Sequence, residues 1–277
     1  MNGRVLIVAG SDSGGGAGIQ ADIKTVTALG GFAMTAITAL TAQNTEGVHG
    51  IHEVPADFVS QQMEVVFEDL GADCVKIGML HRPDIIDAVV RALDKYAHDI
   101  PIVVDPVMIA KGGASLLEEA AMEALKERLI PKADILTPNL PEAEALANRQ
   151  GNSAFDAEAL AQTLLALGPK AVLLKGGHRV GAIVRDLLMS VSGAVEMFEN
   201  ARIETVHTHG TGCTLSSAIT TFYSCGKTLK KSCEMAIKYV NEAIATRPNY
   251  GKGHGPINHL NSCLLYTSPS PRDKRQS

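Results

Sequence analysis

Several features are scarce in this chain of 277 residues, and each scarcity excludes a class of protein. Tryptophan is absent and aromatic residues make up only 4% of the sequence, so the core has to consist mainly of Ala, Val, Ile and Leu. No apolar run reaches the roughly 18–20 residues that cross a bilayer. The apolar run near the start, Val5 to Ala9, is too short for the core of a signal peptide. We therefore expect a cytoplasmic protein without a membrane partner.

The sequence also lacks an excess of positive charge, a CxxC pair of cysteines and a known nucleotide-binding loop. The formal charge is -5 and no long basic run lies inside the domain, which argues against nucleic acid as a partner. The five cysteines include no CxxC pair, so we expect reduced thiols. A Walker A loop is also missing, because the nearest match has Thr221 where the first glycine is required.

Short apolar runs alternate with longer amphipathic stretches. Five apolar runs predict buried strands, and each has Gly, Pro or Asn at or near its end. They cover residues 4–10, 73–79, 100–108, 133–139 and 170–177, and a last short run covers 201–206. The stretches that predict helices include 84–97, 119–130 and 156–167. This alternation predicts an α/β fold with a mostly parallel central sheet that is covered by helices on both faces.

The chain shows no break in composition between residues 1 and 261, so we expect a single domain there. Residues 262–277 differ, because they are rich in Ser and Pro, basic and without periodicity. This segment is predicted to be a disordered tail. Non-native sequence from cloning or assembly explains it better than a natural interaction tail does.

In such a fold, ligands bind where the parallel strands end, and the first predicted strand is followed by GSDSGGGAGIQAD, residues 10–22. Glycines allow a backbone to approach a ligand closely, and the helix start that follows offers free N–H groups. The spacing does not fit the dinucleotide fingerprint GxGxxG. A tight turn with a purely structural role is the alternative.

Three later strands also end in polar residues. Asn139 and Glu142 in TPNLPEAEAL could form a helix cap, or could hold a hydrated Mg²⁺ through their oxygens. Asp105, at the end of another strand, is a second acidic candidate for the same ion. Lys175 follows a buried strand and is well placed to contact phosphate.

The stretch HTHGTGCTLSSAI, residues 207–219, raises three hypotheses for Cys213. A zinc site is disfavoured, because the spacing of His207, His209 and Cys213 matches no common ligand pattern. A helix start would expose the N–H groups of Thr211 to Cys213 to an anion and would favour the thiolate. A small residue packed under the helix is the third hypothesis.

These motifs occur in one order along the chain and together form a recognisable set. In sequence they are AGSDSGGGAGIQADIKT, TALTAQNT, KIGML, DPVMIAKGG, TPNLPEAEAL, KGGH, HTHGTGCTLSSAI and GKGHGPINHL. The set resembles the hydroxymethylpyrimidine/phosphomethylpyrimidine kinases, the thiamine-pathway branch of the ribokinase-like superfamily. The resemblance covers residues 4 to about 260.

The resemblance implies a three-layer α/β/α sandwich that uses ATP and Mg²⁺. It implies that 4-amino-5-hydroxymethyl-2-methylpyrimidine is phosphorylated first, and its monophosphate second. Substrate-binding positions are Gln43, which would read the pyrimidine edge, and Asp22, Ala17, Met79 and Val107. Cofactor contacts are Lys175, Thr211 and Asn139, and Glu142 and Asp105 are the metal candidates. Cys213 occupies the place of the superfamily's usual aspartate base, and it is grouped with Gly210 and Gly212 as catalytic.

Rival functions stay open at this point. A pyridoxal or pyridoxine kinase would use the same scaffold, although Gln43 favours an aminopyrimidine. A nucleotide-binding or pyrimidine-binding protein without kinase activity is disfavoured by the intact set of Lys175, Asn139, Glu142 and Cys213. The resemblance also suggests a homodimer, which the sequence itself does not reveal.

Overall fold

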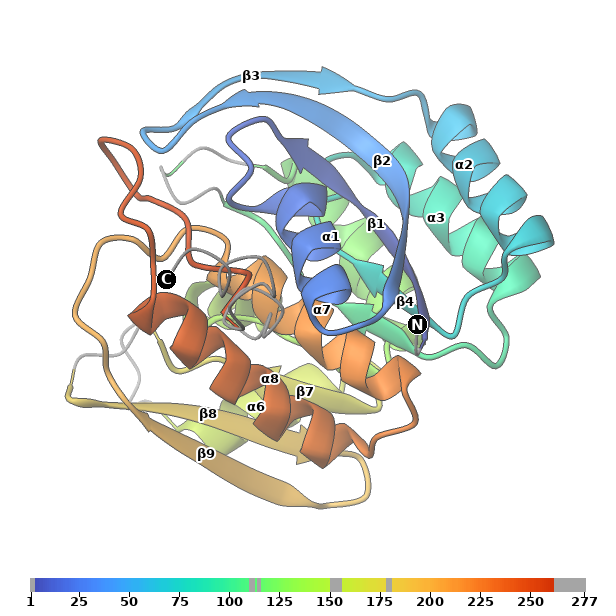
Figure 1. Cartoon of the computed structure of the whole chain (residues 1–277). Helices are drawn as coiled ribbons and strands as arrows, with labels where there is room; N and C mark the ends of the chain where they lie inside the picture. Colours follow the sequence, from blue (N-terminus) through green and yellow to red (C-terminus); the bar gives the residue numbers. More distant parts are fainter. Residues whose placement is uncertain (1–2, 110–112, 114–115, 150–155, 178–180, 262–277) are drawn as a thin grey trace, which may run out of the picture.

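The computed structural model describes residues 3–109, 113, 116–149, 156–177 and 181–261. Their strands join one sheet in the order β3-β2-β1-β4-β5-β6-β7-β8-β9 (Figure 1). The strands from β2 to β7 in this order are parallel, and their bounds are Phe32–Gln43 (β2), Arg4–Asp12 (β1), Cys74–Ile77 (β4), Ile102–Val104 (β5), Ile135–Leu136 (β6) and Ala171–Leu174 (β7). The remaining strands pair antiparallel at the two edges, and they are Val48–Glu53 (β3), Ile183–Ser190 (β8) and Val195–Ala201 (β9).

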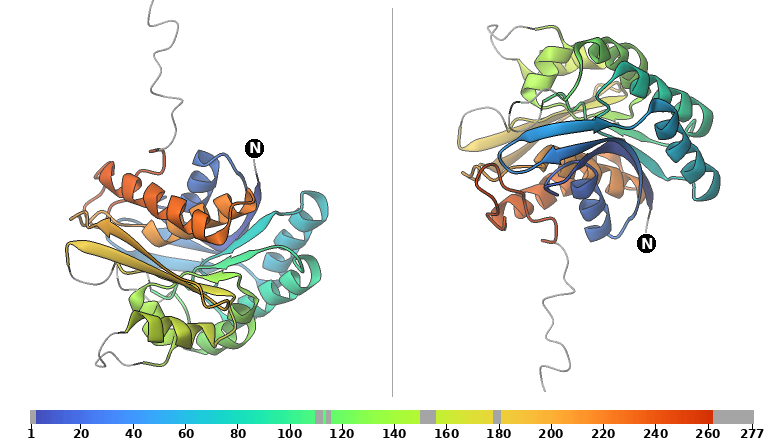
Figure 2. Two further views of the ribbon diagram at one scale, coloured as in Figure 1. Left: turned by 90° about the horizontal axis from the view of Figure 1, so that it is seen from below. Right: turned by 90° about the horizontal axis from the view of Figure 1, so that it is seen from above.

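Helices cover both faces of the sheet (Figure 2). One layer contains Gly18–Ala28 (α1), Thr211–Ser224 (α7) and Leu229–Ala245 (α8). The opposite layer contains Ala56–Asp69 (α2), Pro83–Tyr96 (α3), Glu119–Ala124 (α4), Leu140–Leu146 (α5) and Ala157–Leu165 (α6). The expected three-layer sandwich with a mostly parallel sheet is confirmed.

Alternate residues of the central strands point to opposite helix layers. In β1, Leu6 and Val8 pack with α2 and α3, whereas Val5 and Ile7 pack with α1. Side chains in a strand alternate between faces with a period of two. A strand with helices on both faces therefore has to be apolar at every position, which is why such strands appear in the sequence as continuous apolar runs.

The element predictions were wrong or incomplete in a few places. Only Ala201 of the predicted last run belongs to a strand, since β9 ends there. Strands β2 and β3 and the β8–β9 hairpin were not predicted. The helix expected over 119–130 is α4 only to Ala124, after which the chain continues as a wider π-helical turn, Leu125–Leu129. The predicted tail, 262–277, lies outside the described residues.

The parallel strands bring their carboxyl ends to a common edge of the sheet. The segments that follow β1, β5, β6 and β7 meet there with the first turn of α7. This is the position at which ligands bind in open α/β sheets. Among the described residues, no helix combines the length and apolar character needed to cross a bilayer.

Candidate active site

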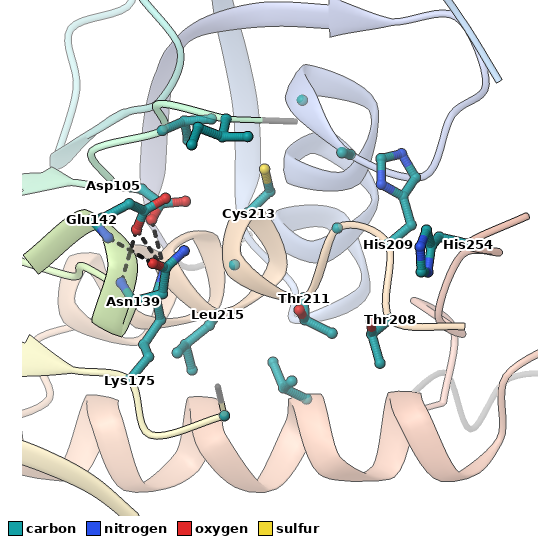
Figure 3. Close-up of a pocket in the computed structure, with 18 of the residues that line it drawn as sticks. Asp105, Asn139, Glu142, Lys175, Thr208, His209, Thr211, Cys213, Leu215 and His254 are labelled. Carbon is teal, nitrogen blue, oxygen red and sulfur yellow. Dashed lines mark hydrogen bonds and ion pairs between the residues drawn. The ribbon is translucent and has the colours of Figure 1, made fainter. Parts of the chain in front are cut away.

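A cavity of about 620 Å³ opens at the carboxyl edge of the sheet. Its wall includes almost all of the site residues predicted from the sequence, namely Ala17, Gln43, Met79, Asp105, Val107, Asn139, Glu142, Lys175, Gly210, Thr211, Gly212 and Cys213. The fold therefore brings together residues that are far apart in the chain. Figure 3 shows the start of α7 in the middle of this cavity, with a group of charged residues on one side and His209 on the other.

The charged end of the cavity is built from Asp105, Asn139, Glu142 and Lys175 (Figure 3). Lys175 Nζ lies 2.9 Å from Asp105 Oδ1 and 3.9 Å from Glu142 Oε2. Burial alone would lower the pKa of Lys175, but the two carboxylates raise it above its ordinary value. The lysine is therefore a permanent cation. It is held at the end of β7 by an isolated bridge between Asn139 and Lys175.

Asn139 and Glu142 form a capping box at the start of α5. Asn139 Oδ1 accepts from the Glu142 N–H at 2.9 Å, and Glu142 Oε2 accepts from the Asn139 N–H at 2.8 Å. The cap hypothesis is thus correct, and both residues also line the cavity. Burial raises the pKa of Glu142 to about 7, although Lys175 opposes this rise. A nearby cation would stabilise the ionised form of this carboxylate.

The N-terminus of α7 forms the floor between the two ends. The first helical hydrogen bond runs from the Thr214 N–H to Gly210 O, so the N–H groups of Gly212 and Cys213 come before the hydrogen-bond ladder of the helix. The Thr211 N–H was expected to face an anion as well, but it donates to Thr208 O at 3.3 Å. Gly210 has φ 81° and a Cβ there would overlap Gly16 O, so only glycine fits this turn. The arrangement is suited to binding an anion.

The thiol of Cys213 points into the cavity from the first turn of α7 (Figure 3). The sequence led us to expect a favoured thiolate, and this expectation is wrong for the free protein. Burial raises the pKa of Cys213 to about 12, Lys76 lowers it, and Asp22 and Asp105 raise it further. Desolvation thus outweighs the helix terminus, and the thiol stays protonated at neutral pH.

Asp22 does not line the cavity, in contrast to the other predicted site residues. It is fully buried in α1, where Oδ2 lies 2.9 Å from Lys76 Nζ and Oδ1 accepts from the Ser217 hydroxyl at 2.7 Å. Lys76, which the sequence analysis missed, is the member of this pair that reaches the cavity wall. A lysine inside an otherwise apolar strand was the signal that could have revealed it.

The opposite end of the cavity is mostly neutral. Ala17, Met79 and Val107 supply apolar surface, and the Gln43 amide supplies hydrogen bonds. Beside Gln43, His209 Nε2 lies 2.9 Å from Asp12 Oδ2. The geometry therefore gives His209 a carboxylate partner rather than a metal.

The zinc hypothesis gains no support elsewhere. In the described part of the chain, Glu53, His81 and Glu118 form the group of at least three His, Cys, Asp or Glu side chains whose ligand atoms lie within 4.8 Å of one another, and this group does not include Cys213.

One apolar wall of the cavity was missed in the sequence. Ile237, Val240 and Ile244 project into it from α8. Their spacing of three, four and seven residues is that of one helix face. An apolar wall in the same cavity as Lys175 and the start of α7 is suited to an adenine ring.

Comparison with known proteins agrees with this geometry. A family model described as phosphomethylpyrimidine kinase matches residues 12–258. The hydroxymethylpyrimidine/phosphomethylpyrimidine kinase of Bacillus subtilis (strain 168) is 47% identical over 258 residues, which cover 93% of this chain and 94% of that protein. The thiamine biosynthesis bifunctional protein ThiED of Geobacter sulfurreducens is 48% identical, but the match covers 93% of this chain and only 52% of that longer protein.

Solved structures give the same fold. The Bacillus subtilis pyridoxal kinase in an ADP complex superposes with a TM-score of 0.85 and 31% identity, over 94% of this chain and 98% of that one. The phosphomethylpyrimidine kinase of Clostridium difficile 630 has a TM-score of 0.75 and 42% identity, over 87% of this chain and 99% of that one. The Staphylococcus aureus pyridoxal kinase in complex with AMP-PCP and pyridoxal has a TM-score of 0.85 at 30% identity, with 93% of each chain covered.

Proposed function

The chain belongs to the phosphomethylpyrimidine kinase family, and from that premise we propose the reaction that its cavity performs. The terminal phosphoryl group of ATP passes to the hydroxymethyl group of 4-amino-5-hydroxymethyl-2-methylpyrimidine, and in a second turnover to the monophosphate formed in the first. One observation carries this proposal: the same cavity contains a charged end with the buried cation Lys175, a neutral end, and the start of helix α7 between them.

Phosphoryl transfer requires positioning and charge stabilisation more than covalent chemistry. Lys175 supplies a buried ammonium that contacts phosphate oxygens. The N–H groups of Gly212 and Cys213 point from the start of α7 toward the same place, so they hold the oxygens of the transferred group. The apolar side chains of α8 then receive the adenine ring. These contacts fix ATP with its terminal phosphate above α7.

The charged end fits a hydrated Mg²⁺. The donors are oxygens, from Asp105, Glu142 and Asn139, and Mg²⁺ keeps several waters and needs few protein ligands. Burial is the main cause of the raised pKa of Glu142, Lys175 offsets it in part, and the Asp105 carboxylate adds to it. When bound, the ion would neutralise charge on the phosphate oxygens.

Cys213 is proposed as the residue that takes up the proton of the attacking hydroxyl. Because the thiol is protonated in the free protein, this role depends on the small fraction of thiolate and on charges in the complex that favour it. Lys76 is the buried cation that lowers the pKa of this thiol. A general base contributes roughly 10²–10⁴-fold to a rate, so Cys213 supplies one part of catalysis and the anion site supplies the rest.

Pyridoxal is a second candidate substrate. The specific observation in its favour is the backbone, which superposes on two pyridoxal kinases with TM-scores of 0.85. Both substrates carry a hydroxymethyl group on a six-membered nitrogen ring. We propose pyridoxal as a side activity, because the relatives that are 47–48% identical are hydroxymethylpyrimidine kinases or thiamine biosynthesis proteins by name.

Two further expectations stay predictions. Residues 1–261 are proposed to be one catalytic domain, and the protein is proposed to be a homodimer. Limited proteolysis and sedimentation of the purified chain would test them.

The proposed function is tested by measuring turnover with Mg-ATP and three acceptors: the pyrimidine alcohol, its monophosphate and pyridoxal. We expect turnover with both pyrimidines and a kcat/KM for pyridoxal at least tenfold lower. A kcat/KM for pyridoxal that equals or exceeds the pyrimidine values would transfer the protein to the vitamin B6 kinases. A lack of turnover with all three acceptors would refute the kinase assignment.

A further inference from the structure

A row of polar side chains runs along the neutral end of the cavity, from Asp12 through His209 and Gln43 to Thr41. Asp12 ends β1 and is only 3% exposed. Its Oδ2 accepts from the Ala17 N–H at 2.8 Å and lies 2.9 Å from His209 Nε2. The row thus links the glycine-rich loop after β1 to the segment before α7.

Asp12 determines which nitrogen of His209 carries a hydrogen. Burial raises the pKa of Asp12, but the hydrogen bonds from His209 and Ala17 outweigh burial and leave this pKa below its ordinary value. The carboxylate is therefore ionised at neutral pH and offers acceptors alone. His209 Nε2 lies within hydrogen-bond distance of it, so Nε2 has to be the protonated nitrogen.

That hydrogen restricts the amide of Gln43. Gln43 Nε2 lies 3.4 Å from His209 Nε2, so with this amide orientation two N–H donors face each other. At the other end, the single hydroxyl hydrogen of Thr41 has two acceptors, Ser11 O at 2.8 Å and Gln43 Oε1 at 3.1 Å.

The contact between two donors is removed if the amide turns by about 180° about its last bond, which exchanges the positions of its oxygen and nitrogen. Gln43 Oε1 then faces the single Nε2 hydrogen of His209, which it shares with Asp12 Oδ2 in a three-centre hydrogen bond. Gln43 Nε2 then donates to Thr41 Oγ1, whose own hydrogen goes to Ser11 O.

We propose that Asp12, His209 and Thr41 lock the Gln43 amide in this one orientation, and so determine which hydrogen-bonding edge of a pyrimidine the cavity accepts. Gln43 lines the cavity and keeps one N–H and one oxygen lone pair for a ligand. A 4-aminopyrimidine presents a ring-nitrogen acceptor beside an amino donor, which complements that pair. The inference rests on the proposed function for its choice of ligand.

The lock also requires that the imidazole cannot swing away. His209 is 7% exposed, and its backbone N–H donates to Gly255 O at 3.1 Å, which holds the main chain that carries the ring. The ring lies so close to Gly16 that a Cβ there would overlap His209 Cδ2. Position 16 therefore has to be glycine to leave room for the His209 imidazole, and the glycine-rich loop in turn restricts the movement of that ring.

A 4-oxopyrimidine alcohol, 5-hydroxymethyl-2-methylpyrimidin-4-one, is the discriminating probe. It presents a ring N–H beside a carbonyl, the reverse order of donor and acceptor. The ring cannot turn over to compensate, because its hydroxymethyl group has to face Cys213. A locked amide therefore rejects this probe, whereas an amide free to rotate accepts both compounds.

The test is calorimetric binding of the 4-amino and 4-oxo alcohols to the full chain, without ATP. We expect the wild type to prefer the 4-amino compound by about 100-fold or more, as sites built around paired polar groups do. His209→Leu and Thr41→Val should each lower that preference about tenfold.

Two matched variants keep the hydrogen bonds of the lock. The amide of His209→Gln can donate to both Asp12 and Gln43, and Thr41→Ser retains the hydroxyl. Both should keep most of the preference for the 4-amino alcohol.

Equal or undetectable binding of the two alcohols by the wild type would overturn the inference, as would an unchanged preference in a folded His209→Leu or Thr41→Val protein. Circular dichroism checks the fold, and Thr41→Val carries the test if His209→Leu does not fold. A protein that shows this preference and its loss but transfers no phosphate would refute the proposed function and leave the inference standing.

Discussion

The two ends of the cavity are built from opposite kinds of side chain. At the charged end, the carboxylates of Asp105 and Glu142 both lie within 4 Å of Lys175 Nζ. At the neutral end, the cavity wall contains the Gln43 amide beside His209 and the apolar side chains of Ala17, Met79 and Val107. In the proposed complex, phosphate is recognised by charge, and the pyrimidine is recognised by shape and by the order of its hydrogen-bond donors and acceptors.

This division has a physical reason. Charges interact strongly where water is excluded, so a few of them suffice to hold and activate a phosphate. They recognise any phosphate, however, and cannot distinguish one ring from another. Discrimination between ring edges needs neutral donors and acceptors in fixed positions, because an unpaired buried polar group is costly. The start of α7 lies between the ends and serves both.

The largest effect is expected from Lys175→Met. The change removes the phosphate-binding cation and leaves Asp105 and Glu142 without it, so we expect kcat/KM to fall about 10³-fold or more for every acceptor alike. Steady-state kinetics with both pyrimidines and with pyridoxal measures this.

The matched control is Lys170→Met, at the other end of β7, where the lysine is 73% exposed and pairs with Asp134. It should change kcat/KM less than about twofold, because exposed ion pairs contribute little. If Lys175→Met lowered kcat/KM for one acceptor only, the charged end would also select the ring, and the division of roles between the two ends would be wrong.

Cys213→Ala should lower kcat about 10²–10⁴-fold with little change in the affinity for ATP. Since burial holds the pKa of the thiol at about 12, the thiolate fraction rises about tenfold per pH unit below that value. The kcat/KM of the wild type should therefore rise with pH from 7 to 9, and the variant should lose that slope. Rates across this pH range measure both.

Cys225→Ala is the control, since Cys225 follows the far end of α7. Full activity of Cys213→Ala at every pH would show that the thiol only shapes the site and would favour the alternative of a structural cysteine.

A change at the neutral end should spare the nucleotide. Gln43→Leu removes both hydrogen bonds to the pyrimidine edge, so we expect its KM to rise about 10–100-fold. The Kd for ATP should stay within about twofold. If ATP affinity fell as much as pyrimidine affinity, the two ends would not be separable.

The smallest expected effect is a change in Mg²⁺ affinity with pH. Burial raises the pKa of Glu142 to about 7, so the carboxyl is mostly neutral at pH 6 and mostly ionised at pH 8. The affinity for Mg²⁺ in the presence of ADP should therefore strengthen by about tenfold over this range.

Glu142→Gln keeps an acceptor for the helix cap and should abolish the part of the pH dependence of Mg²⁺ affinity that comes from the protein. The titration of the nucleotide itself is common to both proteins, so the difference between them isolates Glu142. Identical pH profiles in calorimetric titrations would exclude Glu142 as a ligand.

The sequence contained a clear signal for five of the six parallel strands, but not for β2, which is only partly buried, or for the antiparallel strands at the edges. The runs that became β1, β4, β5, β6 and β7 are buried on both faces, and a continuous apolar run is the result. Strands β8 and β9 form an antiparallel hairpin at one edge, and β9 alternates between exposed and half-buried residues. A strand of this kind is harder to recognise in the sequence than a continuous apolar run. The short run at 201–206 was therefore predicted as a strand in place of β9.

The sequence predicted that most of the candidate site residues lie together, but it did not predict their charge states. Lys175, Asn139 and Glu142 lie at the carboxyl ends of strands, and this topology makes them neighbours. The pKa of Cys213 depends on burial and on Lys76, Asp22 and Asp105, which come from other parts of the chain. A local motif cannot reveal such surroundings.

The central claim is that one cavity uses its charged end to phosphorylate a ring that its neutral end selects. Phosphorus NMR of a single reaction with Mg-ATP and the aminopyrimidine alcohol tests it most directly, because it follows substrate, monophosphate and diphosphate together. We predict that the monophosphate appears first and that the diphosphate follows at its expense. ATP hydrolysis to free phosphate, with no phosphorylated pyrimidine, would contradict the claim.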